Sequence, residues 1–142
     1  MATLAKHLKQ LALASILCLT AMSCGTRSQA IDRMVDELNS AQFRAAEART
    51  GLFTDSHAEL DGDTLAITFF CRPHLSLAGI REKQLPELQE SALSEFRAGL
   101  ANERLKNGIE ALRDNHMALL LIWQDTHGNQ VKLPLSPTTI LE

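Results

Sequence analysis

The chain has 142 residues, of which 45% are hydrophobic and 22% are charged, and its net charge is −3. This size and balance predict one globular domain and exclude a disordered chain. Only 4% of the residues are aromatic, with a single tryptophan and no tyrosine. Because a mildly acidic chain with few aromatic rings is poorly suited to bind phosphate backbones or to stack bases, no nucleic-acid partner is expected.

The first residues have the layout of a secretory signal peptide. Residues 1–10 contain Lys6 and Lys9 and no acid, residues 11–22 are almost wholly apolar, and small residues follow. A helix of these apolar residues would span about 18 Å, which is too short to cross a bilayer core of about 30 Å. The pattern therefore predicts a signal peptide over residues 1–23. A buried core helix is the weaker interpretation, because the segment is not amphipathic.

The residues TAMSC, which end at Cys24, resemble the lipobox of bacterial lipoproteins. Ala21 stands where most lipoboxes have leucine, and looser boxes of this kind look similar to those of Bacteroidota lipoproteins. The resemblance covers residues 1–25. It implies that Cys24 is acylated through its sulfur and becomes the first residue of the mature protein. Since each buried methylene contributes about 0.8 kcal/mol, two or three acyl chains would hold the protein firmly to a membrane.

The residues after Cys24 bear on where such a lipoprotein would reside. In the family, an aspartate after the cysteine retains many proteins in the inner membrane, so Gly25 implies the outer membrane. Surface-exposed Bacteroidota lipoproteins often carry an acidic run after the cysteine, and GTRSQ contains no acid. The resemblance thus implies a lipid anchor in the outer membrane, facing the periplasm. Residues 24–30 are then expected to form an extended tether that reaches about 24 Å.

The remaining cysteines leave an alternative open. The small residues of AMS also satisfy the ordinary secretion signal, which would be cut at the same bond. Cys71 stands alone in the mature domain, where an unpaired cysteine is usually buried and inert. If Cys24 were not lipidated, a Cys24–Cys71 disulfide in a secreted, unlipidated domain would be possible.

Residues 31–142 are expected to form a single domain that begins with a helix and a hairpin. The apolar residues of the first segment recur with helical spacing, at Ile31, Met34, Val35 and Leu38. Residues 39–40 can end this helix or cap a further turn. Residues 52–71 predict a β-hairpin that turns at Gly62, with a polar, edge-like first strand and a second strand that ends before Pro73.

The second half of the domain is expected to contain two helices and a second hairpin, without an internal repeat of the first half. Residues 75–100 and 101–115 predict two helices, and Asn115 could close the second in the left-handed conformation. The first of these helices has an apolar stripe of Leu85, Leu88, Ala92, Phe96 and Leu100, with Glu87, Glu90, Glu95 and Arg97 on its solvent side. Residues 117–123 are apolar on both faces, which predicts a central strand. Pro134 places the strand that follows at an edge of the sheet.

The expected fold is a two-layer α+β domain with the order α-ββ-αα-ββ, preceded by the N-terminal signal helix. Two hairpins would form one antiparallel sheet of about four strands, with one face packed against the helices. The mature domain looks like small envelope domains of unknown function, without pointing to one family.

Cys71 and His74, in the segment FFCRPHLS, are the strongest candidates for chemistry. At this spacing they could hold a metal between them or pair a thiolate with a base. A thiol- or metal-dependent enzyme is therefore the alternative function. Two ligands do not make a metal site, however, and a core thiol followed by a loop histidine is the favoured interpretation.

Other motifs do not indicate catalysis. The acidic residues around the first turn lack the ligand spacing of a calcium loop; they are Asp55, Glu59, Asp61 and Asp63. The sequence has no G-x-S-x-G motif and no phosphate-binding glycine loop. We therefore expect neither an enzyme nor a cofactor-binding protein. The expected function is that of a non-catalytic envelope lipoprotein, anchored to the membrane by lipid, which binds another envelope protein or a ligand.

Overall fold

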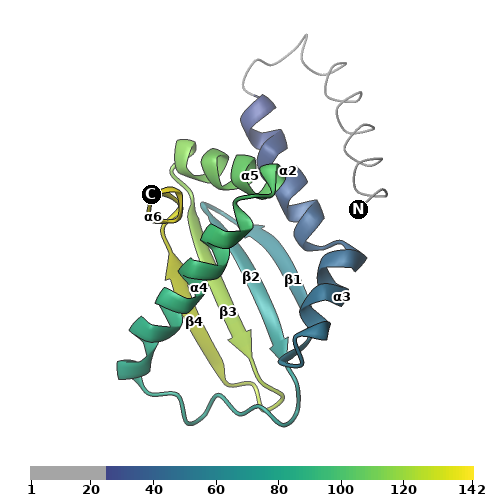
Figure 1. The fold of residues 1–142 in the computed structure, drawn as a ribbon, viewed down its shortest axis with the longest axis vertical. Helices are drawn as coiled ribbons and strands as arrows, with labels where there is room; N and C mark the ends of the chain where they lie inside the picture. Colours follow the sequence, from purple (N-terminus) through teal and green to yellow (C-terminus); the bar gives the residue numbers. More distant parts are fainter. Residues whose placement is uncertain (1–24) are drawn as a thin grey trace.

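The computed structural model describes residues 25–142, with side chains from residue 29 onward. The predicted signal peptide and Cys24 lie outside these residues. The described part has an α+β fold with one four-stranded mixed sheet (Figure 1). In chain order the elements are α2 (Gly25–Leu38), α3 (Ala41–Arg49), β1 (Phe53–Asp61), β2 (Thr64–Cys71), the 3-10 helix η1 (Glu82–Gln84), α4 (Leu85–Gly99), α5 (Glu103–Asp114), β3 (Ala118–Gln124), β4 (Gln130–Leu135) and α6 (Pro137–Leu141).

Helix α2 begins earlier than predicted. It starts at Gly25, so residues 25–30, expected to be an extended tether, form the first turns of a helix. Because a helix rises 1.5 Å per residue, these residues span about 9 Å instead of about 20 Å. The apolar stripe lies as predicted, with Ile31, Met34 and Leu38 buried. The described part of the molecule therefore begins with a helix and not with an extended tether.

Local signals in residues 39–71 are confirmed. Ser40 caps α3, and its Oγ accepts a hydrogen bond from the Phe43 N–H at 3.2 Å. Strands β1 and β2 pair antiparallel around Gly62, whose φ of 59° is readily adopted only by glycine. Strand β2 ends at Cys71, just before Pro73.

The sheet is mixed, which corrects the expected antiparallel sheet. Its order is β1-β2-β3-β4, and the two central strands, β2 and β3, run parallel. The cause is the connection over residues 72–117: α4 runs back along the sheet and α5 crosses its end (Figure 1). Strand β3 therefore starts beside the β1–β2 turn, where the Ala118 N–H donates to the Asp63 carbonyl oxygen at 2.7 Å.

The strands occupy the predicted positions, with β3 inside the sheet and β1 and β4 at its edges. Each edge receives an amide side chain from a helical segment. Asn39 Nδ2 donates to the Ala58 carbonyl oxygen at 2.8 Å, and Asn39 Oδ1 accepts from the Ala58 N–H at 2.7 Å. At the other edge, Gln89 Nε2 donates to the Pro134 carbonyl oxygen at 3.2 Å. Polar groups of both edge strands thus have partners within the chain.

The ends of α5 and the chain terminus differ in detail from the prediction. Asn102 caps the start of α5 as expected, since its side chain accepts from the backbone N–H of the next turn. At the other end, His116 and not Asn115 adopts the left-handed conformation, with a φ of 54°. The Met117 N–H donates to the Leu112 carbonyl oxygen at 2.9 Å, so the left-handed residue follows the cap. Helix α6, which was not predicted, adds one further element.

The tightest packing occurs where α2, α5 and α6 meet, and the contacts α2–α5 and α5–α6 define this end. Gly108 of α5 permits the close approach of α2, because a methyl group there would lie 2.7 Å from Met34 Cβ. The largest fully buried side chains in residues 29–142 are Met34, Leu65, Ile67, Ile109, Leu112, Leu119, Leu133 and Ile140. Their burial contributes to the hydrophobic stabilisation of the domain.

Candidate functional site

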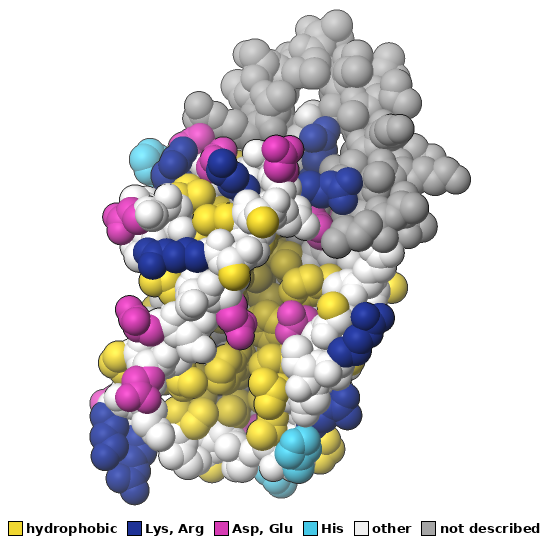
Figure 2. Space-filling model, in the orientation of Figure 1, with side chains coloured by type: hydrophobic (Ala, Val, Ile, Leu, Met, Phe, Trp, Pro, Cys, Tyr) yellow, Lys and Arg dark blue, Asp and Glu magenta, His cyan; other side chains and the backbone are white. Residues whose placement is uncertain are grey.

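A cleft opens between helices α3 and α4, with the sheet as its floor. Its volume is about 360 Å³, which lies near the lower end of the range of about 300–1,000 Å³ for small-molecule pockets. Figure 2 shows this side of the molecule, where hydrophobic side chains are visible in a hollow and acidic side chains lie on both sides of it. The size suits one small ligand better than a protein helix.

The cleft exists because α3 and α4 do not close over the sheet. Helix α3 has no buried residue, and α4 has only Ala92. Helix α3 is instead held to β1 by the Arg44 guanidinium, which donates to both oxygens of the Asp55 carboxylate at 2.6 and 2.8 Å. At its other end, Arg72 donates to the Ala48 carbonyl oxygen at 2.9 Å. These bonds fix the position of α3 without filling the space beside it.

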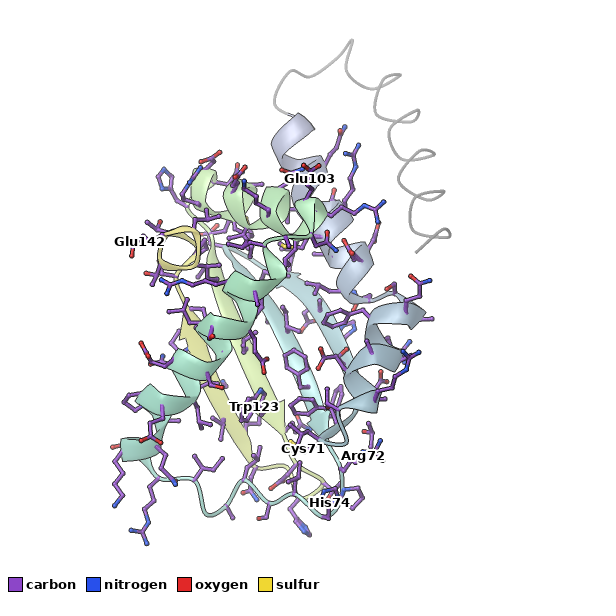
Figure 3. All side chains as sticks on the ribbon, viewed as in Figure 1. Cys71, Arg72, His74, Glu103, Trp123 and Glu142 are labelled. Atoms are coloured by element: carbon purple, nitrogen blue, oxygen red, sulfur yellow. The ribbon has the colours of Figure 1, made fainter. Side chains whose placement is uncertain are left out.

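Aromatic rings form the floor of the cleft. The Phe53 and Phe69 ring centroids lie 5.1 Å apart, and those of Phe53 and Trp123 lie 6.0 Å apart. Trp123, on β3, is half-buried and is the single tryptophan of the chain; Figure 3 shows it between α4 and α3 in this view. Tilted rings of this kind offer an apolar surface that can accept a hydrocarbon chain.

The walls of the cleft come from apolar side chains that are only half-buried. The predicted stripe of α4 faces this space, and Leu88 and Phe96 line it together with Phe43 of α3. An apolar helix stripe with this spacing is usually buried in the protein core. Here it remains partly open to solvent because α3 and α4 stand apart.

Glu47 of α3 and Glu95 of α4 are the charged residues of the lining. Burial raises the pKa of Glu47, and the negative charge of Glu95 raises it further. The two carboxylates thus influence each other across an apolar cleft. Glu95 was expected on the solvent side of α4 and is exposed as predicted, but it also borders the cleft. The sequence did not single out Glu47, because nothing in a chain pattern shows that two helices will face each other.

Cys71 and His74 lie at the lower end of the sheet in Figure 3, where Cys71 pairs with Phe53 of the cleft floor. Cys71 is a free thiol, 4% exposed, on the last residue of β2, and His74 is exposed in the turn that follows. Burial raises the pKa of the Cys71 thiol, and the charge of Asp125 raises it further, which disfavours the reactive thiolate. Among residues 25–142, no group of three or more His, Cys, Asp and Glu side chains is placed to hold a metal ion.

Asp125, 4% exposed, organises the loops beside Cys71. Its carboxylate accepts hydrogen bonds from the Leu77 N–H at 3.0 Å, from the His127 N–H at 2.9 Å, and from the backbone and side chain of Asn129, both at 2.9 Å. Burial opposes ionisation, but these hydrogen bonds outweigh it and lower the pKa of Asp125 to about 2. Asp125 therefore joins the β3–β4 turn to the segment that leads into α4.

Comparisons of the chain with protein-family models, with curated proteins and with solved structures gave no match. In residues 25–142, none of the helices has the length and apolar character needed to cross a membrane. The function must therefore be inferred from the cleft and from the N-terminal sequence.

Proposed function

We propose that the protein is a non-catalytic binding protein of the bacterial cell envelope, which takes a small apolar ligand into the cleft between α3 and α4. The observation that carries this proposal is the cleft itself: an apolar space of about 360 Å³ with an aromatic floor, open to solvent. Half-buried apolar residues in a helix are ordinarily covered, because exposed apolar surface is unfavourable. A ligand would cover the surface that the helices leave open.

The proposal includes the lipid anchor at Cys24 and residence in the outer membrane on the periplasmic side. The lipobox-like TAMSC and the following Gly25 support it. The folded domain would then lie close to the membrane, since α2 starts at Gly25. The alternative is a secreted, unlipidated domain in which Cys24 and Cys71 form a disulfide.

The proposal also includes the two-layer arrangement expected from the sequence. The alternating burial of β4 supports it, because Val131, Leu133 and Leu135 are buried whereas Lys132 and Pro134 are exposed. One face of the sheet would pack against the helices and the other would face solvent. The cleft is then a gap in the helical layer.

The cleft proposal can be tested with Trp123 as the reporter. The full chain, in phosphatidylcholine vesicles, is titrated with a brominated long-chain alcohol, which quenches a tryptophan on contact. We expect saturable quenching, and we expect Ser91→Phe, which places a ring in the cleft, to weaken it about tenfold or more. Ser94→Phe on the exposed side of α4 is the matched control and should quench like the wild type. Quenching that is absent, or equal in both variants, would show that the cleft is not a binding site.

A further inference from the structure

The charges at the cleft all have the same sign. Its lining residues include Glu47 and Glu95 but no lysine, arginine or histidine. The two glutamates come from different helices, so they stand on the two walls of an otherwise apolar space. Any ligand that fills the cleft must therefore lie beside two carboxylates.

Neighbouring cations do not neutralise these carboxylates. The ion pairs within the described residues are Arg44–Asp55, His57–Glu59 and Arg113–Asp114. Arg44, one turn before Glu47, is engaged by Asp55 through two hydrogen bonds. Arg97, two residues after Glu95, donates to the Thr139 carbonyl oxygen at 2.8 Å. Arg44 and Arg97 are thus held by other partners, and Arg49, two residues after Glu47, is exposed and forms none of these ion pairs.

Two unpaired carboxylates near an apolar surface are electrostatically unfavourable, and a cation between them is favourable. Burial and the charge of Glu95 both act against ionisation of Glu47. A positive group in the cleft would offset both effects, and its attraction is stronger beside apolar walls than in bulk water. A negative group would be repelled by the same pair.

We infer that the ligand of this cleft is a cationic amphiphile, a single hydrocarbon chain or ring system that carries an amine or guanidinium group held between Glu47 and Glu95. This inference rests on the proposed function and names the ligand class of the same site. The apolar part would lie on Phe53, Phe69 and Trp123, and the volume of about 360 Å³ limits it to one such molecule. The arrangement disfavours fatty acids, although they have the same apolar part.

The test uses three photoreactive probes that share one diazirine-bearing dodecyl chain and end in an amine, an alcohol or a carboxylate. The full chain in phosphatidylcholine vesicles is irradiated with each probe at neutral pH, and the labelled residues are mapped by mass spectrometry. We expect labelling in the cleft in the order amine, alcohol, acid, with the amine favoured over the acid by about tenfold or more, equivalent to about 1.4 kcal/mol.

Two double variants separate the role of the pair from a general charge effect. Glu47→Gln with Glu95→Gln should abolish the preference for the amine while the alcohol still labels the cleft. Glu87→Gln with Glu90→Gln removes the same charge from exposed positions of α4 outside the lining, and it should retain the preference. Urea unfolding of both variants confirms that the fold is intact.

The outcomes distinguish the two proposals. Absence of cleft labelling by the alcohol and the amine would overturn the proposed function together with this inference. Cleft labelling without a preference for the amine, or with a preference that survives Glu47→Gln and Glu95→Gln, would overturn this inference alone. The inference would also be wrong if a basic amphipathic peptide displaced the alcohol while the amine bound no better than the alcohol, because the occupant would then be a protein segment.

Discussion

The helices at the two ends of this molecule bury very different numbers of their residues. At the closed end, formed by α2, α5 and α6, helix α5 buries Ile109, Ala111 and Leu112 together with Gly108. At the open end, α3 buries no residue and α4 buries only Ala92. Both α4 and α5 are amphipathic, so the difference lies in how close the helices come to each other and to the sheet.

This contrast shows that the closely packed helices and the apolar cleft are separated within one small domain. The closed end buries the side chains of Met34, Ile109, Leu112 and Ile140, and this burial contributes to the stability of the fold. The open end is fixed by hydrogen bonds, such as the pair between Arg44 and Asp55, and leaves the apolar surface of the cleft open to solvent. Substitutions at the two ends should therefore have unequal effects on folding.

The largest difference is expected between two leucines on neighbouring helices. Leu112→Ala removes a side chain with no exposed surface at the closed end, and it should lower the free energy of unfolding by about 3 kcal/mol. Leu88→Ala removes a half-buried side chain from the cleft wall and should lower it by about 1 kcal/mol. Urea denaturation followed by Trp123 fluorescence measures both. Equal losses would mean that the open end is packed as tightly as the closed end.

A smaller difference is expected between two helical glycines. In Gly108→Ala, the new methyl group meets Met34 at the contact of α2 and α5, where backbone and side chains are fixed. Overpacking outweighs the gain in helix propensity, so the free energy of unfolding should fall by about 1–2 kcal/mol.

Gly99→Ala is the matched control for this substitution. Its methyl group meets only Leu105 Cδ2, the end of a side chain that can rotate away. The change should therefore stay within about 0.5 kcal/mol. A Gly108→Ala protein as stable as the wild type in thermal unfolding would contradict the close packing of α2 on α5.

The smallest of the three expected differences concerns acid. As the pH falls, the loops held by Asp125 at the open end should loosen before the closed end does. The folded-state pKa of Asp125 is about 2, below its usual 3.8, so the ionised carboxylate stabilises the folded state. This contribution is complete above about pH 4 and is lost as the pH falls through about 2. Amide exchange at Leu77 and in the 125–129 turn should therefore accelerate over this interval. In Asp125→Asn, exchange there should be faster at neutral pH and should respond less to acid; an unchanged acid response would rule out this carboxylate as the cause.

Much of the fold was predictable because its signals are local. Gly62 marks a turn, Asn102 marks a helix start, and Pro134 marks an edge strand, and each acts through its own backbone geometry. The C-terminal helix α6 was missed although Ser136 caps it and Pro137 follows, because a segment of five residues has little periodicity.

The direction of β3 and the cleft could not be predicted for a different reason. The parallel pairing of β2 with β3 depends on where α4 and α5 return the chain, which local patterns do not encode. Similarly, the stripe that contains Leu88 and Phe96 has the same spacing whether it is covered or open. Glu47 and Glu95 become neighbours of one cleft only after α3 and α4 are placed, so their joint role appears first in three dimensions.

The hydrogen bonds that the Asn39 and Gln89 side chains make at the sheet edges bear on how copies of the protein behave at high local concentration. An unpaired strand edge can recruit a strand from a neighbouring molecule and start a fibril. Here Asn39 occupies both backbone groups of Ala58, and Gln89 together with the proline ring obstructs the opposite edge at Pro134. A strand from a neighbouring copy would have to displace these hydrogen bonds before it could pair at Ala58 or Pro134.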